Sequence, residues 1–193
     1  MSIDPLRAHR IVLVAFDVDG TLTDNGVYIG EPPGAVDATS RIELKRFDIQ
    51  DGLGIVMLRR AGIKVAFISA RHSAATTLRA TELGVHHLKQ GRGLKKVPTL
   101  LALSDEVQVP LDAMAFMGDD LADIAVMQQV GLSAAPANAV AEVKAVATVC
   151  LTREGGRGAA REFIELLLRA RNQWDGLVAE YVAESAHVSA SVA

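Results

Sequence analysis

Residues 11–21 read IVLVAFDVDGT, an unbroken apolar run followed at once by two aspartates, a glycine and a threonine. An apolar run rich in β-branched residues is typical of a strand buried on both faces of a parallel sheet. In open α/β sheets the ligand crevice lies at the carboxyl ends of the strands, so we expect Asp17 and Asp19 there. Gly20 allows the backbone to turn sharply beside them. A solvated acidic turn is the alternative, and the buried strand in front of it argues against that alternative.

The rest of the chain alternates similar apolar runs with helical stretches. Strands are predicted at residues 11–16, 63–68, 85–88, 113–117 and 146–151, and helices at 51–61, 73–83, 94–103, 120–130, 159–171 and 173–183. Gly62, Gly84 and Gly131 each follow one of these helices, at the position where helices commonly end. This order predicts an α/β fold with a Rossmann-like parallel sheet and helices on both faces.

One segment departs from the alternation, between the first strand and the helix predicted at 51–61. Residues 27–29 and 42–47 have strand-like patterns, the second alternating apolar and polar side chains, which predicts a β-hairpin. We expect this hairpin as an insertion at about residues 22–48 of a single domain over 1–184, with a long connector at 30–40. Residues 185–193 are expected to form a flexible tail.

Composition excludes several classes of protein. The 193 residues fit one domain with an insertion, and 20 Lys and Arg against 23 Asp and Glu leave a net charge of −3. Without a basic block, nucleic-acid binding is not expected. The single cysteine excludes internal disulfides and Cys-rich zinc sites. No apolar run is long enough for a signal-peptide core or a membrane span, so we predict a soluble cytoplasmic protein with no membrane partner.

The paired aspartates predict a magnesium site. Burying two carboxyl groups together is costly unless a cation or a proton offsets them. Mg²⁺ prefers oxygen ligands, uses one or two carboxylates and keeps positions for phosphate oxygens and water. Asp119, Asp120 and Asp123 follow the strand predicted at 113–117 and so reach the same edge of the sheet. Asp119 and Asp123 share a helix face, which suits Asp119 on the metal with Asp123 supporting it, while helix capping is an equal alternative for Asp120 and Asp123.

Residues 17–21 (DVDGT) resemble the first motif of the haloacid dehalogenase superfamily of phosphotransferases. The three further motifs follow in order at 68–71 (ISAR), 90–95 (QGRGLK) and 117–123 (MGDDLAD). The resemblance implies that Asp17 is both the nucleophile and a metal ligand. It also implies that Asp19 is the general acid/base and binds the metal through its backbone carbonyl. Asp119 would complete the Mg²⁺ site, with Asp120 and Asp123 supporting it.

The same resemblance assigns phosphate binding to Ser69 and to Lys95, in preference to Lys96. Taken alone, Ser69 is better explained as a helix cap, and the two lysines as a solvated helix start. The motifs lie too close together along the chain for a cap domain, so the site is expected to be open to water. Either a macromolecular substrate or a neighbouring subunit would then close it.

From residue 11 to about 168 the chain resembles the 3-deoxy-D-manno-octulosonate 8-phosphate (KDO 8-phosphate) phosphatases, a capless family of this superfamily. The matching stretches are 44–55, 69–71, 90–91, 118–121 and 155–159. The resemblance implies Mg²⁺-dependent hydrolysis of KDO 8-phosphate through an aspartyl-phosphate, in lipopolysaccharide precursor biosynthesis. It also implies a homotetramer in which hairpins help to cover neighbouring sites. Residues 155–158 would dock near an active site, and the implied substrate-side residues are Arg71, Arg79, Asp48, Asp51 and Gly52.

Two departures leave the substrate open. Val56 stands where the family often carries arginine, and the hairpin connector is longer than usual. A phosphatase of a nonulosonic acid 9-phosphate, or of another small sugar phosphate, is therefore the alternative. A non-catalytic phosphoryl-receiver domain is a different class, and Asp19 argues against it. An oligomeric scaffold on a degenerate hydrolase fold is a third class, and the complete set of motif residues argues against that.

Overall fold

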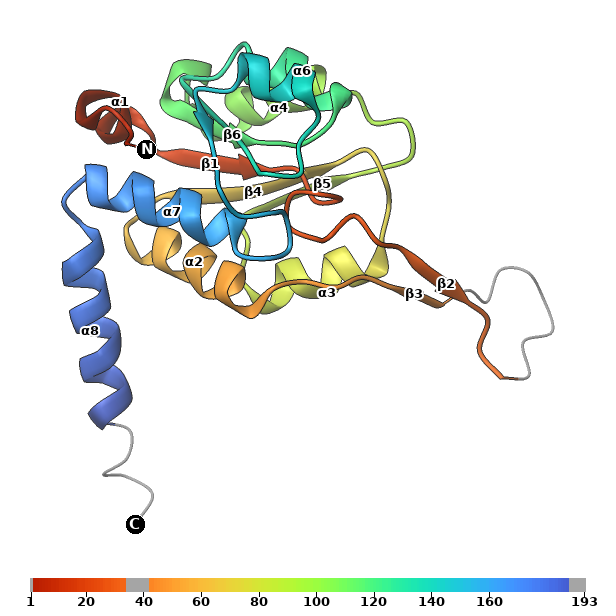
Figure 1. Ribbon diagram of the computed structural model, residues 1–193, viewed down its shortest axis with the longest axis horizontal. Helices are drawn as coiled ribbons and strands as arrows, with labels where there is room; N and C mark the ends of the chain where they lie inside the picture. Colours follow the sequence, from red (N-terminus) through yellow and green to blue (C-terminus); the bar gives the residue numbers. More distant parts are fainter. Residues whose placement is uncertain (1, 34–41, 188–193) are drawn as a thin grey trace.

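A six-stranded parallel sheet forms the centre of the molecule, in the order β5-β4-β1-β6-β7-β8 (Figure 1). The computed structural model describes residues 2–33 and 42–187. The strands are β1 (Leu13–Phe16), β4 (Lys64–Ser69), β5 (His87–Gln90), β6 (Met114–Met117), β7 (Leu132–Ala135) and β8 (Val149–Cys150). The predicted α/β fold with a parallel sheet is confirmed, and β1 pairs with both β4 and β6 at its centre.

Helices cover both faces of the sheet, because successive side chains of the buried strands point to opposite sides. Val14 and Phe16 of β1 pack into one core, and Leu13 and Ala15 pack into the other. The first core is covered by α1 (Pro5–Arg10), α2 (Ile49–Arg60), α3 (Ala74–Glu82), α7 (Ala159–Ala170) and α8 (Trp174–His187). The second is covered by α4 (Lys96–Val107), α5 (Ile124–Met127) and α6 (Ala141–Val146).

The structure differs from the sequence prediction at several elements. Strand β7 was not predicted, because Ser133 interrupts a short run of small residues; in the structure this buried serine accepts a 3.0 Å hydrogen bond from the Thr148 amide. Helices α1 and α6 were also missed. The helix predicted at 120–130 is instead a 3-10 turn (Leu121–Asp123) followed by the short α5.

The last described element is the C-terminal helix α8. Helix α8 extends away from the sheet and continues to His187, three residues into the predicted tail, while residues 188–193 lie outside the described residues (Figure 1). Over the described ranges, no helix has both the length and the apolar character that crossing a membrane requires. The cytoplasmic location stays a prediction.

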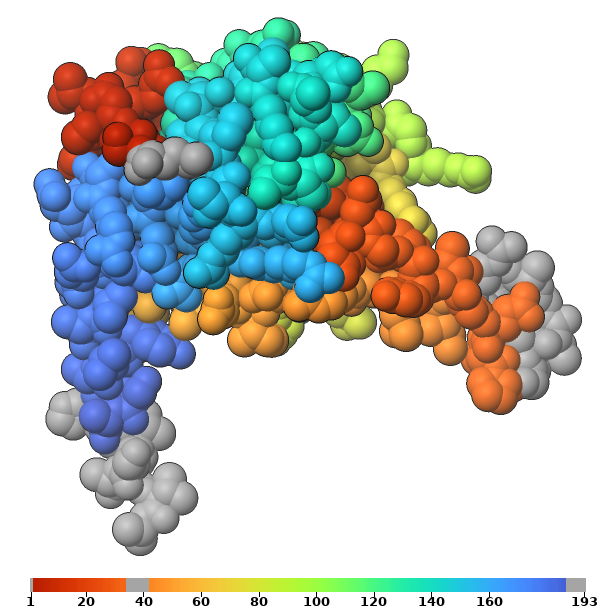
Figure 2. All heavy atoms as spheres, viewed as in Figure 1, coloured from red at the N-terminus to blue at the C-terminus, as the bar shows by residue number. Residues whose placement is uncertain are grey.

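The predicted hairpin is present after β1, as β2 (Tyr28–Gly30) and β3 (Ile42–Leu44), which pair antiparallel. It projects from the body of the molecule (Figures 1 and 2). Most of its connector, residues 34–41, lies outside the described residues. Tyr28 and Leu44 are opposite each other and are 64% and 61% exposed, so an apolar face of the hairpin faces solvent.

Hydrogen bonds at the start of α2 join this helix to the start of α7. Asp48 is the N-cap of α2, because its carboxylate accepts a 2.7 Å hydrogen bond from the Gln50 amide. Asp51 is buried and accepts hydrogen bonds from the amides of Gly158 (3.3 Å) and Arg161 (2.8 Å) at the start of α7. Burial nevertheless raises the pKa of Asp51 to about 6, against the effect of these hydrogen bonds.

This raised pKa predicts a pH-dependent stability. Between the unfolded value of 3.8 and the folded value of about 6, the native state binds more protons than the unfolded chain, so stability falls as pH rises through that window. Asparagine cannot ionise. The stability of Asp51→Asn relative to the parent protein should therefore increase from about pH 4 to about pH 7, by up to about 3 kcal/mol.

Urea denaturation across that pH range measures the difference. Asp105→Asn, at an exposed position of α4, is the matched control and should show no such trend. A stability difference for Asp51→Asn that is constant with pH would contradict the prediction.

Candidate active site

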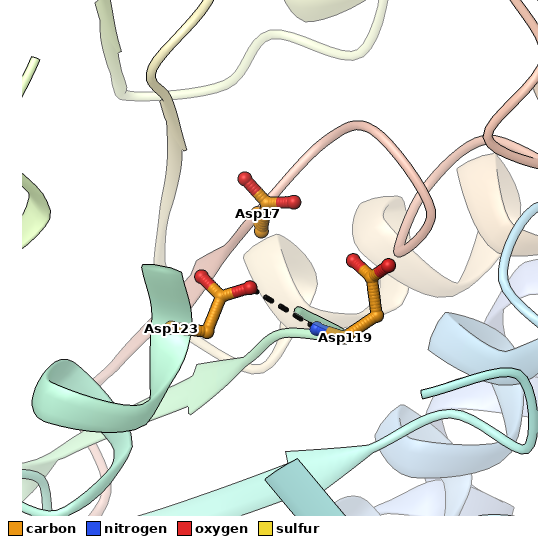
Figure 3. Close-up of side chains that lie close together, drawn as sticks. All are labelled: Asp17, Asp119 and Asp123. Atoms are coloured by element: carbon orange, nitrogen blue, oxygen red, sulfur yellow. Dashed lines mark hydrogen bonds between the residues drawn. The ribbon is translucent and has the colours of Figure 1, made fainter. Parts of the chain in front are cut away.

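Three buried carboxylates meet at the carboxyl edge of the sheet (Figure 3). Asp17 directly follows β1, Asp119 follows the neighbouring strand β6, and Asp123 ends the 3-10 turn after β6. One oxygen of each lies within 4.8 Å of the others. The structure thus brings together Asp17, Asp119 and Asp123 from the set predicted for the metal site.

This acidic cluster fits a divalent cation. It offers only oxygen donors from carboxylates, which are the ligands that Mg²⁺ prefers. Burial raises the pKa of Asp119 to about 6, and burial together with the charges of Asp123 and Asp119 raises that of Asp17. Since the charged forms are disfavoured without a counter-charge, a metal ion held by the three side chains would relieve that cost.

The protein's own cation at this cluster is Lys96. Its Nζ lies 2.6 Å from Asp17 Oδ1 and 2.5 Å from Asp123 Oδ1, and its side chain is only 5% exposed. Although burial lowers it, the pKa of Lys96 is held above its ordinary value by Asp17 and Asp123. The ammonium group is therefore charged at neutral pH.

Lys95 is the lysine predicted to bind phosphate, but the structure places Lys96 at the cluster. Lys95 is the residue before the first turn of α4, and its side chain is exposed. One step along a helix rotates the side chain by about 100°, so only one of the two adjacent lysines can face the cluster. The sequence did not show at which residue the helix begins.

The turn after Asp17 is shaped to lie against Asp119. Gly20 has a φ of +87°, and a Cβ there would lie 2.0 Å from Asp119 Oδ2, so this position requires glycine. The buried Thr21 hydroxyl donates to Asp119 Oδ1 at 2.9 Å. Thr21 is part of the DVDGT motif, and its contact fixes the orientation of the Asp119 carboxylate.

A second loop of the same chain packs against this turn. Asn138 donates to the Gly20 carbonyl (2.8 Å) and accepts from the Gly155 amide (2.6 Å). A Cβ at Gly155 would lie 1.9 Å from the Gly20 carbonyl oxygen. Residues 155–158, whose site of action the sequence left open, therefore dock on the Asp17–Thr21 turn of their own subunit.

The Asp19 side chain forms an ion pair with a lysine of the hairpin segment. Its Oδ1 lies 2.6 Å from Nζ of Lys45, the residue after β3. The Lys45 side chain has no solvent exposure, while that of Asp19 is 23% exposed. Lys45 was missed because a lysine in an alternating strand is ordinarily solvated. Only the orientation of the hairpin shows that this face turns inward.

Glu43 and Arg71 extend this charged face. Glu43 Oε1 lies 3.8 Å from Lys45 Nζ, and Glu43 Oε2 accepts a short hydrogen bond from the Arg71 guanidinium. Although partial burial works to raise it, a hydrogen bond from Ser73 and the charges of Arg71 and Lys45 hold the pKa of Glu43 below its ordinary value. Glu43 is thus a charged partner that the sequence did not single out.

Ser69 and Asp120, two further predicted site residues, lie in different environments, the first buried and the second exposed. Ser69 is buried at the end of β4, where its hydroxyl donates to the Arg71 carbonyl (3.1 Å) and accepts from the Arg71 amide (3.2 Å). Asp120 is exposed and caps the 3-10 turn by accepting from the Leu121 amide at 2.7 Å. Asp120 therefore takes the capping alternative. Asp123 does both, because it accepts a 3.2 Å hydrogen bond from the Asp120 amide in the same capping box and also lies in the cluster.

The remaining substrate-side residues gather around a small pocket of their own beside Phe47. Asp48, Asp51, Gly52 and Arg79 all line it. The Arg79 guanidinium donates to the Asp48 carbonyl (3.1 Å) and to Glu82 (2.8 Å), and it leaves no space for a side chain at Gly52. Arg79 therefore braces α3 against the start of α2, and substrate binding by these four residues stays a prediction.

Comparisons with known proteins agree on one family. A family model described as haloacid dehalogenase-like hydrolase matches residues 91–162. The chain is 38% identical over 170 residues to the 3-deoxy-D-manno-octulosonate 8-phosphate phosphatase of Yersinia pestis, covering 88% of this chain and 86% of that protein. The corresponding Escherichia coli K12 protein is 37% identical over 172 residues, covering 88% and 85%.

Solved structures give the same result. The 3-deoxy-D-manno-octulosonate 8-phosphate phosphatase of Moraxella catarrhalis, in complex with a magnesium ion, a phosphate ion and a KDO molecule, superimposes with a TM-score of 0.83. It is 35% identical in sequence, and the match covers 92% of this chain and 97% of that one. A relative of the same fold therefore holds the metal that the acidic cluster fits.

The position of Lys96 beside Asp17 can be tested by substitution. Lys96→Met should lower the hydrolysis of a phosphomonoester such as 4-nitrophenyl phosphate about 100-fold or more, because it removes the positive charge beside Asp17. Lys95→Met, one residue away and exposed, is the matched control and should stay within about twofold. Steady-state rates are compared after circular dichroism has shown both variants to be folded. Loss of activity in Lys95→Met with retention in Lys96→Met would reverse the assignment.

Proposed function

The chain belongs to the KDO 8-phosphate phosphatase family of haloacid dehalogenase-like hydrolases, a capless phosphomonoesterase family, and on this premise we propose that its substrate is KDO 8-phosphate. The products would be KDO and inorganic phosphate, in the formation of lipopolysaccharide precursors. The observation that carries the proposal is the buried Asp17, Asp119 and Asp123 cluster with Lys96 beside it.

The proposed chemistry assigns a step to each side chain. Mg²⁺, when bound, would stabilise the negative charge of the phosphoryl group in transfer. Asp17 attacks phosphorus, the bond to the sugar oxygen breaks, and an aspartyl-phosphate forms. Asp19 donates a proton to the departing oxygen and later accepts one from the water that hydrolyses the intermediate. Lys96 already lies 2.6 Å from Asp17, where its charge would bind the phosphoryl oxygens.

Charges near the mouth of the site support a substrate that carries a carboxylate. Arg71 follows β4, is 40% exposed and pairs with a carboxylate of the chain itself. A guanidinium group is well suited to bind a carboxylate or a phosphate. Val56, where relatives often carry arginine, packs against the apolar core on α2. A nonulosonic acid 9-phosphate, which also carries a carboxylate, is therefore the second candidate.

We also propose that the protein forms a homotetramer through its hairpins. Apolar side chains are exposed on one face of the hairpin (Tyr28, Ile42, Leu44) and beside it (Ile49, Leu78). An apolar surface of this kind, on a short two-stranded sheet with open edges, is commonly covered by association. The site has no cap domain, so a neighbouring hairpin would also enclose it.

A substrate panel tests the proposed reaction. With Mg²⁺, KDO 8-phosphate should have the highest kcat/KM among sugar phosphates, ahead of nonulosonic acid 9-phosphates, and EDTA should abolish phosphate release. Asp17→Asn should reduce turnover to the background rate, because it removes the nucleophile while keeping the shape of the side chain. A different preferred sugar acid would overturn the substrate, and near-normal turnover in Asp17→Asn would overturn the nucleophile.

The oligomer has a separate test. Leu44→Asp places a charge on the exposed apolar face and should shift the mass measured by multi-angle light scattering from tetramer to smaller species. Leu101→Asp, an exposed leucine on α4, is the control and should leave the mass unchanged. A monomeric parent protein would refute the proposed association.

A further inference from the structure

Arg71, the cation placed for a substrate carboxylate, is already bound to a carboxylate of the chain. Glu43 reaches it from β3 of the hairpin and accepts a short hydrogen bond from its guanidinium. The two residues come from separate elements, the hairpin insertion and the end of the core strand β4. Their contact therefore depends on how the hairpin lies against the sheet.

Glu43 lies between two cations, Lys45 and Arg71. Its second oxygen is 3.8 Å from Nζ of Lys45, and its side chain is only 20% exposed. Lys45 is in turn bound to Asp19, so the row Asp19–Lys45–Glu43–Arg71 alternates in charge from the catalytic turn outward. A substrate carboxylate bound to Arg71 would place a negative charge at the outer end of this row and continue the alternation.

A sugar acid brings the same functional group to the same edge of the sheet. Glu43 holds Nη2 of Arg71, and both edges on which a guanidinium binds a carboxylate through two hydrogen bonds include Nη2. A sugar-acid carboxylate bound in this bidentate way therefore competes with Glu43 for the same nitrogen. The phosphoryl group is bound at the other end, near Asp17. Binding of the sugar acid thus requires Glu43 to give up Arg71, whereas binding of a phosphate without a carboxylate does not.

We propose that Glu43 is a specificity-determining residue, a carboxylate of the chain that occupies the position on Arg71 taken by the substrate's carboxylate and is displaced by it. The inference rests on the proposed function, since it needs a sugar acid phosphate as substrate. Glu43 lowers the affinity for the substrate and for the sugar acid product alike. Its return to Arg71 after hydrolysis favours release of the product.

Glu43→Gln tests this displacement, because glutamine keeps the shape and removes the charge. The dissociation constant of KDO, measured by calorimetry with Mg²⁺ present, should fall about three- to fivefold, the range of a partly exposed ion pair. The KM for KDO 8-phosphate should fall by a similar factor. The KM for glucose 6-phosphate, which has no carboxylate, should not change.

Two further variants make the result unambiguous. Glu106→Gln removes the carboxylate of another ion pair, with Lys89 on the protein surface, and should leave all three constants unchanged. Glu43→Ala should change KDO binding in the same direction as Glu43→Gln, which guards against an effect of the glutamine amide. Circular dichroism shows whether each variant is folded.

The outcomes separate the two proposals. If Glu43→Gln leaves KDO binding unchanged, or weakens the binding of KDO and of glucose 6-phosphate together, the displacement is refuted and Glu43 only holds the hairpin. If the parent protein releases no phosphate from KDO 8-phosphate, the proposed function fails instead. A selective gain for the ligands that carry a carboxylate supports the inference.

Discussion

Negative charge buried at the carboxyl ends of β1 and β6 is the constraint on which the rest of the site depends. Three carboxylates removed from water repel one another, and burial raises the pKa values of Asp17 and Asp119. Such a cluster is stable only with compensating positive charge and hydrogen-bond donors. Lys96 supplies the charge, and the backbone amides of Asp119 and Asp120 both donate to Asp123, at 3.1 and 3.2 Å. The same imbalance that is costly for folding suits the cluster to a divalent cation.

The elements around the cluster hold it from several directions. Thr21 fixes Asp119 from the turn after β1, and Asn138 ties that turn to the loop containing Gly155. Their close approach leaves no space for a Cβ at Gly20 or Gly155, which explains why these two positions are glycines. Residues that are far apart in the sequence thus form one rigid surface behind the carboxylates. This preorganisation matters because catalysis of phosphoryl transfer relies on positioning and on charge stabilisation.

The sequence was sufficient for five of the six sheet strands and for the motif aspartates, because both depend on local signals. A buried parallel strand is apolar throughout, and an aspartate directly after it must reach the edge where ligands bind. The boundary of α4 was not predictable to one residue, and that single residue decided between Lys95 and Lys96. Strand β7 was missed because its residues are small and include a buried serine. Lys45 and Glu43 were missed for a different reason, since their role depends on the side of the hairpin that faces the body, which no local pattern encodes.

The hairpin has two chemically different faces, and they are linked by strand geometry. Along β3 and the residue after it, Ile42 and Leu44 alternate with Glu43 and Lys45, so the apolar side chains point to solvent and the charged ones point to the active site. A shift of one residue in register would exchange the two faces and place leucine against Asp19. A subunit that packs on the apolar face would therefore also fix how Lys45 and Glu43 meet Asp19 and Arg71. If the proposed association holds, it would depend on the same strand as the proposed contact with the substrate, so a change in one would affect the other.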